Sequence, residues 1–209
     1  MVGTGSGPLL RKPLGKVTEP KIVTLRDGTK ATVYPINSVE KIPQSLFNYL
    51  HKEFNEELDR GQTYPYYHQQ SSEEFKESWF QAFVAIMLKG ENPGLGDEST
   101  NWDELYLGTY YIKPNYAGRC SHNCNAGFLV STNSRGKGVG KALGKTYLDW
   151  APVLGYTYSV FNLVFVTNVA SVKIWDSLGF DRIGLVPKAA DLKGYDEPVD
   201  AIQFGKRLA

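Results

Sequence analysis

A glycine-rich turn between two apolar segments limits the choice of fold more than any other part of this sequence. Residues 135–141 read Arg-Gly-Lys-Gly-Val-Gly-Lys. The apolar run 124–130 before the turn predicts a strand, and the apolar spacing within 138–151 predicts a helix after it. Glycines let backbone N–H groups approach a ligand, and the first turn of a helix leaves its N–H groups unpaired at a positive dipole end. Together these features predict an anion site that suits a diphosphate.

Two common phosphate-binding patterns do not fit this turn. A P-loop would need Ser or Thr after Lys141, and alanine stands there. The dinucleotide pattern Gly-x-Gly-x-x-Gly fails because lysine or leucine occupies the place of the third glycine. The spacing that does fit is Arg-x-x-Gly-x-Gly over residues 135–140. The alternative interpretation is a flexible surface turn with incidental charge.

Periodicity and turn residues predict the other elements. The arms around Asp27-Gly28 predict a hairpin with a type I′ turn, and an apolar residue at every fourth position predicts a helix from Pro43 to Gly61. Ser71 and Glu74 form a capping-box pattern that opens a second helix. Segment 80–88 fits a strand or a helix. Further strands are predicted at 105–112, 124–130, 158–166, 180–186 and 201–208, with helices at 138–151 and 169–178. This order indicates an α/β or α+β fold with a mixed sheet and crossover helices.

Length and composition indicate one domain without a bulk charge. We expect residues 1–18 to form a disordered tail and residues 19–209 a single domain. With 23 basic and 22 acidic residues, the chain has no general electrostatic attraction for nucleic acid or membranes. Two cysteines, no apolar signal segment and no spanning run favour the cytoplasm, with a mitochondrial location as the alternative. Cys120, His122 and Cys124 lack a nearby fourth ligand, so no metal site is predicted.

A second motif gives the turn a family context. Residues 168–180 contain Asn-x-x-Ala, then an aromatic residue, then Leu-Gly-Phe. This second motif follows the glycine turn by about 30 residues. Together, and in this order, the two motifs resemble the two acetyl-CoA-binding motifs of the GCN5-related N-acetyltransferase (GNAT) superfamily. The resemblance implies a GNAT fold, a mixed and mostly antiparallel sheet with two splayed central parallel strands, and acetyl-CoA as co-substrate. The cofactor-binding residues implied are Phe128, Leu129, Val130, Arg135, Gly136, Lys137, Gly138, Val139, Gly140, Lys141, Asn168, Ser171 and Trp175.

A narrower resemblance covers most of the chain after the tail. The runs 107–130, 155–168, 178–187 and 197–202 are similar to fungal L-azetidine-2-carboxylate (proline-analogue) N-acetyltransferases. That family acetylates the ring nitrogen of small cyclic imino acids, including cis-4-hydroxyproline, and the resemblance implies a homodimer and a role in oxidative-stress tolerance. It also implies that Asn125 recognises the substrate and that the backbone N–H groups of Asn162 and Leu163 hold its carboxylate.

Amine attack on a thioester needs a polarised carbonyl, a stabilised leaving thiolate and a neutral nitrogen. Gly127 inside an apolar strand suggests a bulge, which would free the Phe128 N–H for the thioester carbonyl. Trp175 stands where many superfamily members place a tyrosine acid, so the Asn168 amide is the predicted hydrogen-bond donor to sulfur. No general base is evident, and His122 is a candidate only by its position near Asn125.

Two alternatives to an imino-acid acetyltransferase stay open at this point. The same fold could acetylate another amine, such as a polyamine, a drug or a protein N-terminus. The chain could instead be a non-catalytic acyl-CoA-binding module, which the absent tyrosine and the absent base would suit.

Overall fold

Alternating side chains along the strands give the sheet two buried faces. We describe residues 14–208 of a computed structural model. On strand β3 (Phe83–Lys89), Phe83, Ala85 and Met87 enter one core, and the alternate residues Val84, Ile86 and Leu88 enter the other. Segment 80–88, which the sequence left open between strand and helix, is therefore largely a strand. It has a near-continuous apolar run because both of its faces are covered.

Eight strands form one sheet in the order β1-β2-β3-β4-β5-β6-β8-β7. All neighbours are antiparallel except β5 and β6, which are parallel. The mixed, mostly antiparallel sheet predicted from the sequence is therefore confirmed. The remaining strands are β1 (Lys21–Thr24), β2 (Lys30–Ile36), β4 (Tyr106–Pro114), β5 (Asn123–Val130), β6 (Tyr158–Phe165), β7 (Asp181–Ala190) and β8 (Val199–Arg207).

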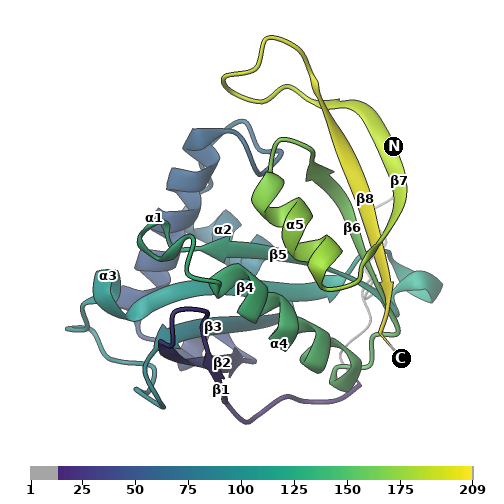
Figure 1. The fold of residues 1–209 in the computed structure, drawn as a ribbon. Coiled ribbons are helices and arrows are strands. Elements are labelled where there is room, and N and C mark those ends of the chain that lie inside the picture. Colours follow the sequence, from purple (N-terminus) through teal and green to yellow (C-terminus); the bar gives the residue numbers. More distant parts are fainter. Residues whose placement is uncertain (1–13, 209) are drawn as a thin grey trace.

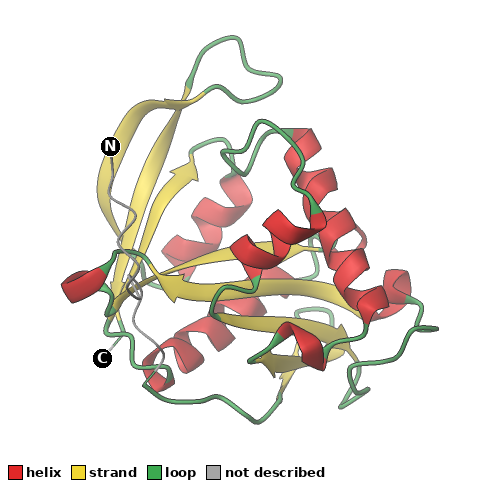
Figure 2. Cartoon of the chain, turned by 180° about the vertical axis from the view of Figure 1, so that it is seen from behind, coloured by secondary structure: helices red, strands yellow, loops and turns green. Residues whose placement is uncertain are grey.

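Helices cover both faces of the sheet. Helices α4 (Val139–Val153) and α5 (Val169–Ser177) lie on the face seen in Figure 1. Helices α1 (Gln44–Arg60) and α2 (Ser72–Trp79) cover the opposite face, seen in Figure 2. The capping box at Ser71 and Glu74 is confirmed, with both reciprocal hydrogen bonds present. Short helical turns complete the chain: η1 (Val39–Lys41), α3 (Trp102–Leu105), η2 (Gly118–Cys120) and η3 (Thr132–Ser134).

The parallel strands β5 and β6 pair only at their beginnings. The register contains two pairs, Asn123 with Tyr158 and Cys124 with Ser159. Beyond these pairs the strands diverge, and Trp175 of α5 packs against Phe128 of β5 and Phe161 of β6, at ring-centroid distances of 4.9 and 4.5 Å. The buried indole therefore contacts one aromatic ring from each of the two diverging strands. We call the space between them the strand split.

Three sequence predictions need correction. The β1–β2 turn has a positive φ at Gly28 but not at Asp27, so it is not type I′. Instead, the Leu25 carbonyl accepts from the Gly28 N–H, and the Leu25 N–H donates to the Thr29 carbonyl. This pattern defines a three-residue loop that ends in a left-handed glycine. Residues 14–18 were assigned to a disordered tail, yet Val17 is buried in the core and its carbonyl accepts from Asn37. Residues 1–13 of that predicted tail lie outside the described part of the chain.

The predicted bulge at Gly127 is also absent. Strands β4 and β5 pair in an unbroken register from Gly108 with Val130 to Pro114 with Cys124. A Cβ atom at position 127 would lie 2.8 Å from Cζ of Tyr111. Glycine is needed at this position because the Tyr111 ring covers the backbone, and not because the strand is irregular.

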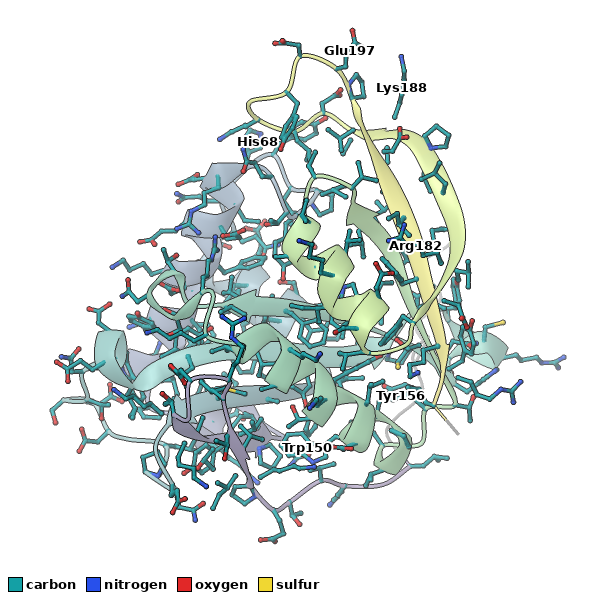
Figure 3. The ribbon with its side chains drawn as sticks, viewed as in Figure 1. His68, Trp150, Tyr156, Arg182, Lys188 and Glu197 are labelled. Atoms are coloured by element: carbon teal, nitrogen blue, oxygen red, sulfur yellow. The ribbon has the colours of Figure 1, made fainter. Side chains whose placement is uncertain are left out.

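The loop between β7 and β8 reaches back to the end of α1. The Lys193 N–H donates to the Gly61 carbonyl at 3.0 Å, and its ammonium donates to the Asp59 carbonyl at 2.8 Å. Figure 3 shows Lys188 and Glu197 at this end of the hairpin, where they form a 3.8 Å ion pair. The β7–β8 hairpin therefore passes over α5 and connects this edge of the sheet to the end of α1.

Candidate active site

The glycine turn and the start of α4 form one wall of a large cleft of about 1330 Å³. Gly136 and Gly138 have φ angles of 77° and 90°, in the left-handed region that favours glycine. Gly138 is the N-cap of α4, so the first N–H groups of the helix face the turn. The anion site predicted from the sequence therefore has the required backbone conformation.

Gly140 has a different role from Gly138. A Cβ atom there would lie 2.9 Å from Cδ1 of Ile174 on α5, and one at Gly144 would lie 2.6 Å from Leu178. The two glycines are four residues apart and form a small-residue stripe on which α5 rests. They bring the starts of both helices to the same cleft.

Basic side chains from distant segments surround this wall. Arg26, in the β1–β2 loop, donates to the Gly136 carbonyl at 3.1 Å and so holds the turn from outside. Lysines from α4 and α5 also line the cleft, which suits a ligand carrying several phosphate charges. These basic residues are Lys141, Lys145 and Lys173, in addition to Arg26 and Arg135.

Arg135 is oriented by a buried carboxylate that the sequence analysis did not single out. Glu57 of α1 is 5% exposed and accepts from Arg135 at 2.6 Å, from Arg60 at 2.5 Å and from Thr63 at 2.6 Å. Burial alone would raise the pKa of Glu57, but the hydrogen bonds from Thr63 and Arg135 outweigh it and lower the pKa below its ordinary value. Glu57 therefore stays ionised at neutral pH and connects α1 to the phosphate turn.

Replacing Glu57 by glutamine is expected to raise the Kd for acetyl-CoA about 5- to 10-fold, because Arg135 loses its fixed orientation. Isothermal titration calorimetry measures this effect. Glu56→Gln is the matched control, because Glu56 lies on the same helix in an exposed 3.8 Å ion pair with Lys52. An unchanged Kd in a folded Glu57→Gln protein would contradict this role.

The edge of β5 that faces the strand split offers backbone donors. The Asn115 N–H donates to Asn123 and the Ser131 N–H donates to Leu107, which fixes the hydrogen-bonding alternation of β4 and β5. Odd-numbered residues of β5 thus bond to β4, and the N–H of Phe128 points toward β6. Because β6 has diverged there, the split presents this N–H to a ligand. Phe128 is a candidate carbonyl donor by strand divergence, not by a bulge.

Asn168 is the N-cap of α5, and its side-chain oxygen accepts from the Ser171 N–H at 3.2 Å. This bond leaves its amide N–H groups for the cleft, which Asn168 lines. Trp175 is 5% exposed and also lines the cleft. The structure therefore places a hydrogen-bond donor, and no tyrosine, at the start of α5.

Three asparagines meet where β5 and β6 part. The Asn115 side-chain oxygen accepts from Asn125 at 3.1 Å and from Asn162 at 2.6 Å, and Asn115 donates to the Asn162 oxygen at 3.1 Å. We call these residues the amide cluster. Strand β6 has a register shift between Phe161 and Val164, so Asn162 and Leu163 lie in an irregular stretch of backbone. The sequence resemblance predicted Asn125, Asn162 and Leu163 as substrate-binding residues, but it gave no signal for Asn115.

The cleft collects nearly all of the predicted cofactor residues. Of the thirteen, only Lys137 does not line it, and the Lys137 ammonium donates to the Asn133 carbonyl instead. His122 is exposed and its ring contacts the Asn123 amide, so it does not face the cleft. Cys124 is buried beside the Tyr147 hydroxyl at 3.1 Å. Within residues 14–208 no group of three potential metal-binding side chains is found.

A sheet split between two parallel strands, with an anion-binding helix start beside the split, defines a GNAT-type acyltransferase fold. The Acetyltransferase (GNAT) family model matches residues 122–180, which contain both the turn and α5. N-acetyltransferase aca1 of Schizosaccharomyces pombe is 42% identical over 166 residues, covering 77% of this chain and 79% of aca1. The chain belongs to the GNAT family of acetyltransferases and is an acetyl-CoA-dependent N-acetyltransferase.

Other relatives and solved structures agree on the fold. Protein SPT10 of Saccharomyces cerevisiae is 38% identical over 229 residues, covering 91% of this chain, which spans only 36% of the length of SPT10. A GCN5-related N-acetyltransferase from Kribbella flavida superposes with a TM-score of 0.69 at 27% identity, covering 84% of this chain and 97% of that one. The structure of yncA from Salmonella typhimurium, solved with acetyl-CoA, superposes with a TM-score of 0.65 at 15% identity, covering 85% of this chain and 94% of yncA.

None of the helices between residues 14 and 208 combines the length and apolar character needed to cross a membrane.

Proposed function

We propose that this enzyme acetylates the ring nitrogen of small cyclic imino acids such as L-azetidine-2-carboxylate and cis-4-hydroxyproline. The supporting observation is the amide cluster of Asn115, Asn125 and Asn162, which lies at the apex of the strand split. These half-buried amides hydrogen-bond to one another, and a small carboxylate-bearing ring can take over part of that bonding. The resemblance of the sequence to fungal proline-analogue acetyltransferases points to the same substrates.

In this proposal the acceptor attacks acetyl-CoA directly within a ternary complex. Asn125 recognises the substrate, and the irregular backbone at Asn162 and Leu163 holds its carboxylate. The Phe128 N–H polarises the thioester carbonyl, and the Asn168 amide stabilises the departing thiolate. Such donors act best where water is excluded and the groups are already in position.

A carboxylate-bearing acceptor is consistent with a further relative. N-acetylaspartate synthetase of Xenopus tropicalis is 40% identical over 57 residues, which cover 27% of this chain and 21% of that protein. Its name describes an acetylated amino acid. Detoxification of proline analogues, oxidative-stress tolerance and a homodimeric assembly belong to the same proposal and rest on the sequence resemblance. The proposed cytoplasmic location rests on the cysteine content and the sequence pattern.

The substrate assignment is tested by thiol release. Purified enzyme with acetyl-CoA is mixed with L-azetidine-2-carboxylate, cis-4-hydroxyproline, aspartate, a polyamine or a peptide N-terminus. We expect the two imino acids to give the highest kcat/KM. Faster turnover of a polyamine or a peptide would reject this substrate class, and acetyl-CoA binding without any turnover would indicate a binding module.

Asn125→Ala is expected to raise the KM for the imino acid about 10-fold or more, with kcat changed less, because substrate recognition is lost before the acetyl transfer step. Initial rates at saturating acetyl-CoA measure both constants. Asn123→Ala is a matched control on the same strand, since its amide bonds to the Cys120 carbonyl outside the amide cluster. If Asn125→Ala lowers kcat at constant KM, Asn125 acts in the acetyl transfer step, the role proposed for Asn168, and not in substrate recognition.

A further inference from the structure

Lys113 of β4 stands directly beside the substrate-recognition residue predicted on β5. The register pairs Lys113 with Asn125, and residues directly opposite each other in an antiparallel pair share one face of the sheet. That face also carries Gly127 and Leu129, and Leu129 belongs to the core under α1 and α2. Lys113 therefore lies on the acceptor side of the sheet, while α4 and the phosphate turn lie on the other.

The Lys113 side chain reaches along the strand to the Tyr111 ring. Its ammonium nitrogen is 4.7 Å from the centroid of that ring. The Tyr111 ring in turn covers the backbone of Gly127, which immediately precedes Phe128. These contacts connect the Lys113 amine to the backbone beside the Phe128 N–H, the group that we propose polarises the thioester carbonyl.

A small cavity of about 10 Å³ lies beside Lys113. Tyr64 lines both spaces, and its hydroxyl donates to the Phe128 carbonyl at 2.9 Å. Among the described residues that line this cavity, Lys113 is the single charged side chain. Its other lining residues are Phe54 of α1, Tyr64 and Tyr66 of the following loop, Ser78 and Trp79 of α2, and Tyr111 of β4.

We propose that Lys113 is the general base that takes the proton from the acceptor nitrogen, an assignment that rests on the proposed acetylation of an amine. A neutral Lys113 amine accepts one proton from the bound ammonium, which leaves a lone pair on the acceptor nitrogen. That nitrogen forms a bond to the acetyl carbon, and the carbon–sulfur bond breaks with its electron pair on sulfur. The remaining N–H proton passes to the thiolate, and Lys113 returns its proton to solvent.

Burial of Lys113 acts in favour of this role, and the cation–π contact with the Tyr111 ring, which stabilises the ammonium, acts against it. Burial lowers the pKa of the Lys113 ammonium below its ordinary value, which enlarges the fraction of neutral amine at neutral pH. The titratable groups that face it are phenols, Tyr64, Tyr66 and Tyr111, and burial raises the pKa of Tyr64 and of Tyr111. Both of these phenols stay protonated, so neither competes for the proton at pH 7. Within residues 14–208, no carboxylate lines the cavity to hold Lys113 in its charged form.

The test compares Lys113→Met and Lys113→Arg with the unmodified enzyme across pH 6–10. At pH 7 we expect both variants to lose about 10²-fold in kcat/KM for L-azetidine-2-carboxylate, since a positioned base contributes about 10²–10⁴-fold. The loss should shrink to a few-fold near pH 10, where more of the acceptor is already neutral. A small alkoxyamine, whose nitrogen is neutral at pH 7, should be acetylated at similar rates by all three proteins. Lys89→Met, at the exposed end of β3, is the control for removing a lysine.

Three outcomes would overturn the assignment. An equal loss at every pH would indicate a structural role. Full activity in Lys113→Arg with a raised KM in Lys113→Met would make Lys113 a binding group for the carboxylate. Unchanged rates in both variants would exclude any role. If the unmodified enzyme acetylates a different amine, the proposed substrate fails, and the same pH comparison on that amine still tests Lys113.

Discussion

Gly138→Val is expected to raise the Kd for acetyl-CoA by about 100-fold or more. Gly138 has a φ of 90°, which a β-branched residue does not adopt without strain. A side chain there would also contact Arg26, with Cβ 3.2 Å from the Arg26 Cβ. The turn must move, and its amides then no longer converge on the diphosphate. Losing two charge-assisted hydrogen bonds of about 1.5–3 kcal/mol each corresponds to about 10²–10⁴-fold in Kd.

Gly118→Val is the control that separates binding from backbone strain. Gly118 has a φ of 58°, nothing in the described part of the chain lies within 4 Å of where its Cβ would stand, and it does not line the cleft. Both variants should lose about 1–2 kcal/mol of stability from the left-handed backbone, and Gly138→Val should lose more because of its contact with Arg26. Only Gly138→Val should lose acetyl-CoA affinity in calorimetry. Equal affinities in the two folded variants would show that the turn does not bind the coenzyme.

Asn168→Asp is expected to lower kcat by about 10²–10³-fold while leaving the fold intact. An aspartate keeps the oxygen that accepts from Ser171, and an acidic residue suits the start of a helix. It removes the amide N–H groups that are proposed to stabilise the thiolate and adds a negative charge near the sulfur. Losing one preorganised donor to a developing anion typically costs about 10²–10³-fold in rate.

Asn168→Ala separates the two functions of this residue. It should lower kcat to a similar extent, but it should also reduce stability by about 1 kcal/mol, because the N-cap of α5 is lost. Thermal unfolding measures the cap, and steady-state rates measure the donor. If Asn168→Asp keeps full kcat while Asn168→Ala loses it, Asn168 acts only as a helix cap.

Local sequence rules predicted most of the fold. The capping box at Ser71 and Glu74 involves groups three residues apart, so adjacent sequence is enough to specify it. The strand, glycine turn and helix over 124–151 were predicted for the same reason, and the structure confirms their order. The type I′ turn at Asp27 was wrong because an Asp-Gly pair also suits a three-residue loop with only the glycine left-handed.

The residues on the cofactor side of the candidate site were also predicted from the sequence. The residues predicted to bind acetyl-CoA lie in three short segments, 128–130, the turn at 135–141 and the first part of α5 from Asn168. Backbone amides at a helix start bind anions whatever the rest of the fold does. The proposed acceptor side could not be predicted in the same way. Strand register and packing between distant segments place Asn115, Glu57 and Lys113 beside the candidate site.

What the sequence alone determined is the set of elements and the anion-binding turn, because these depend on periodicity and on hydrogen bonds between near neighbours. The family resemblance implied two splayed parallel strands, but only the tertiary structure decided that β5 and β6 part after two residue pairs and that Trp175 packs against a ring of each. It also decided that Gly127 accommodates the Tyr111 ring and not a bulge. These features arise from contacts between residues more than a dozen positions apart, which no local pattern in the chain records.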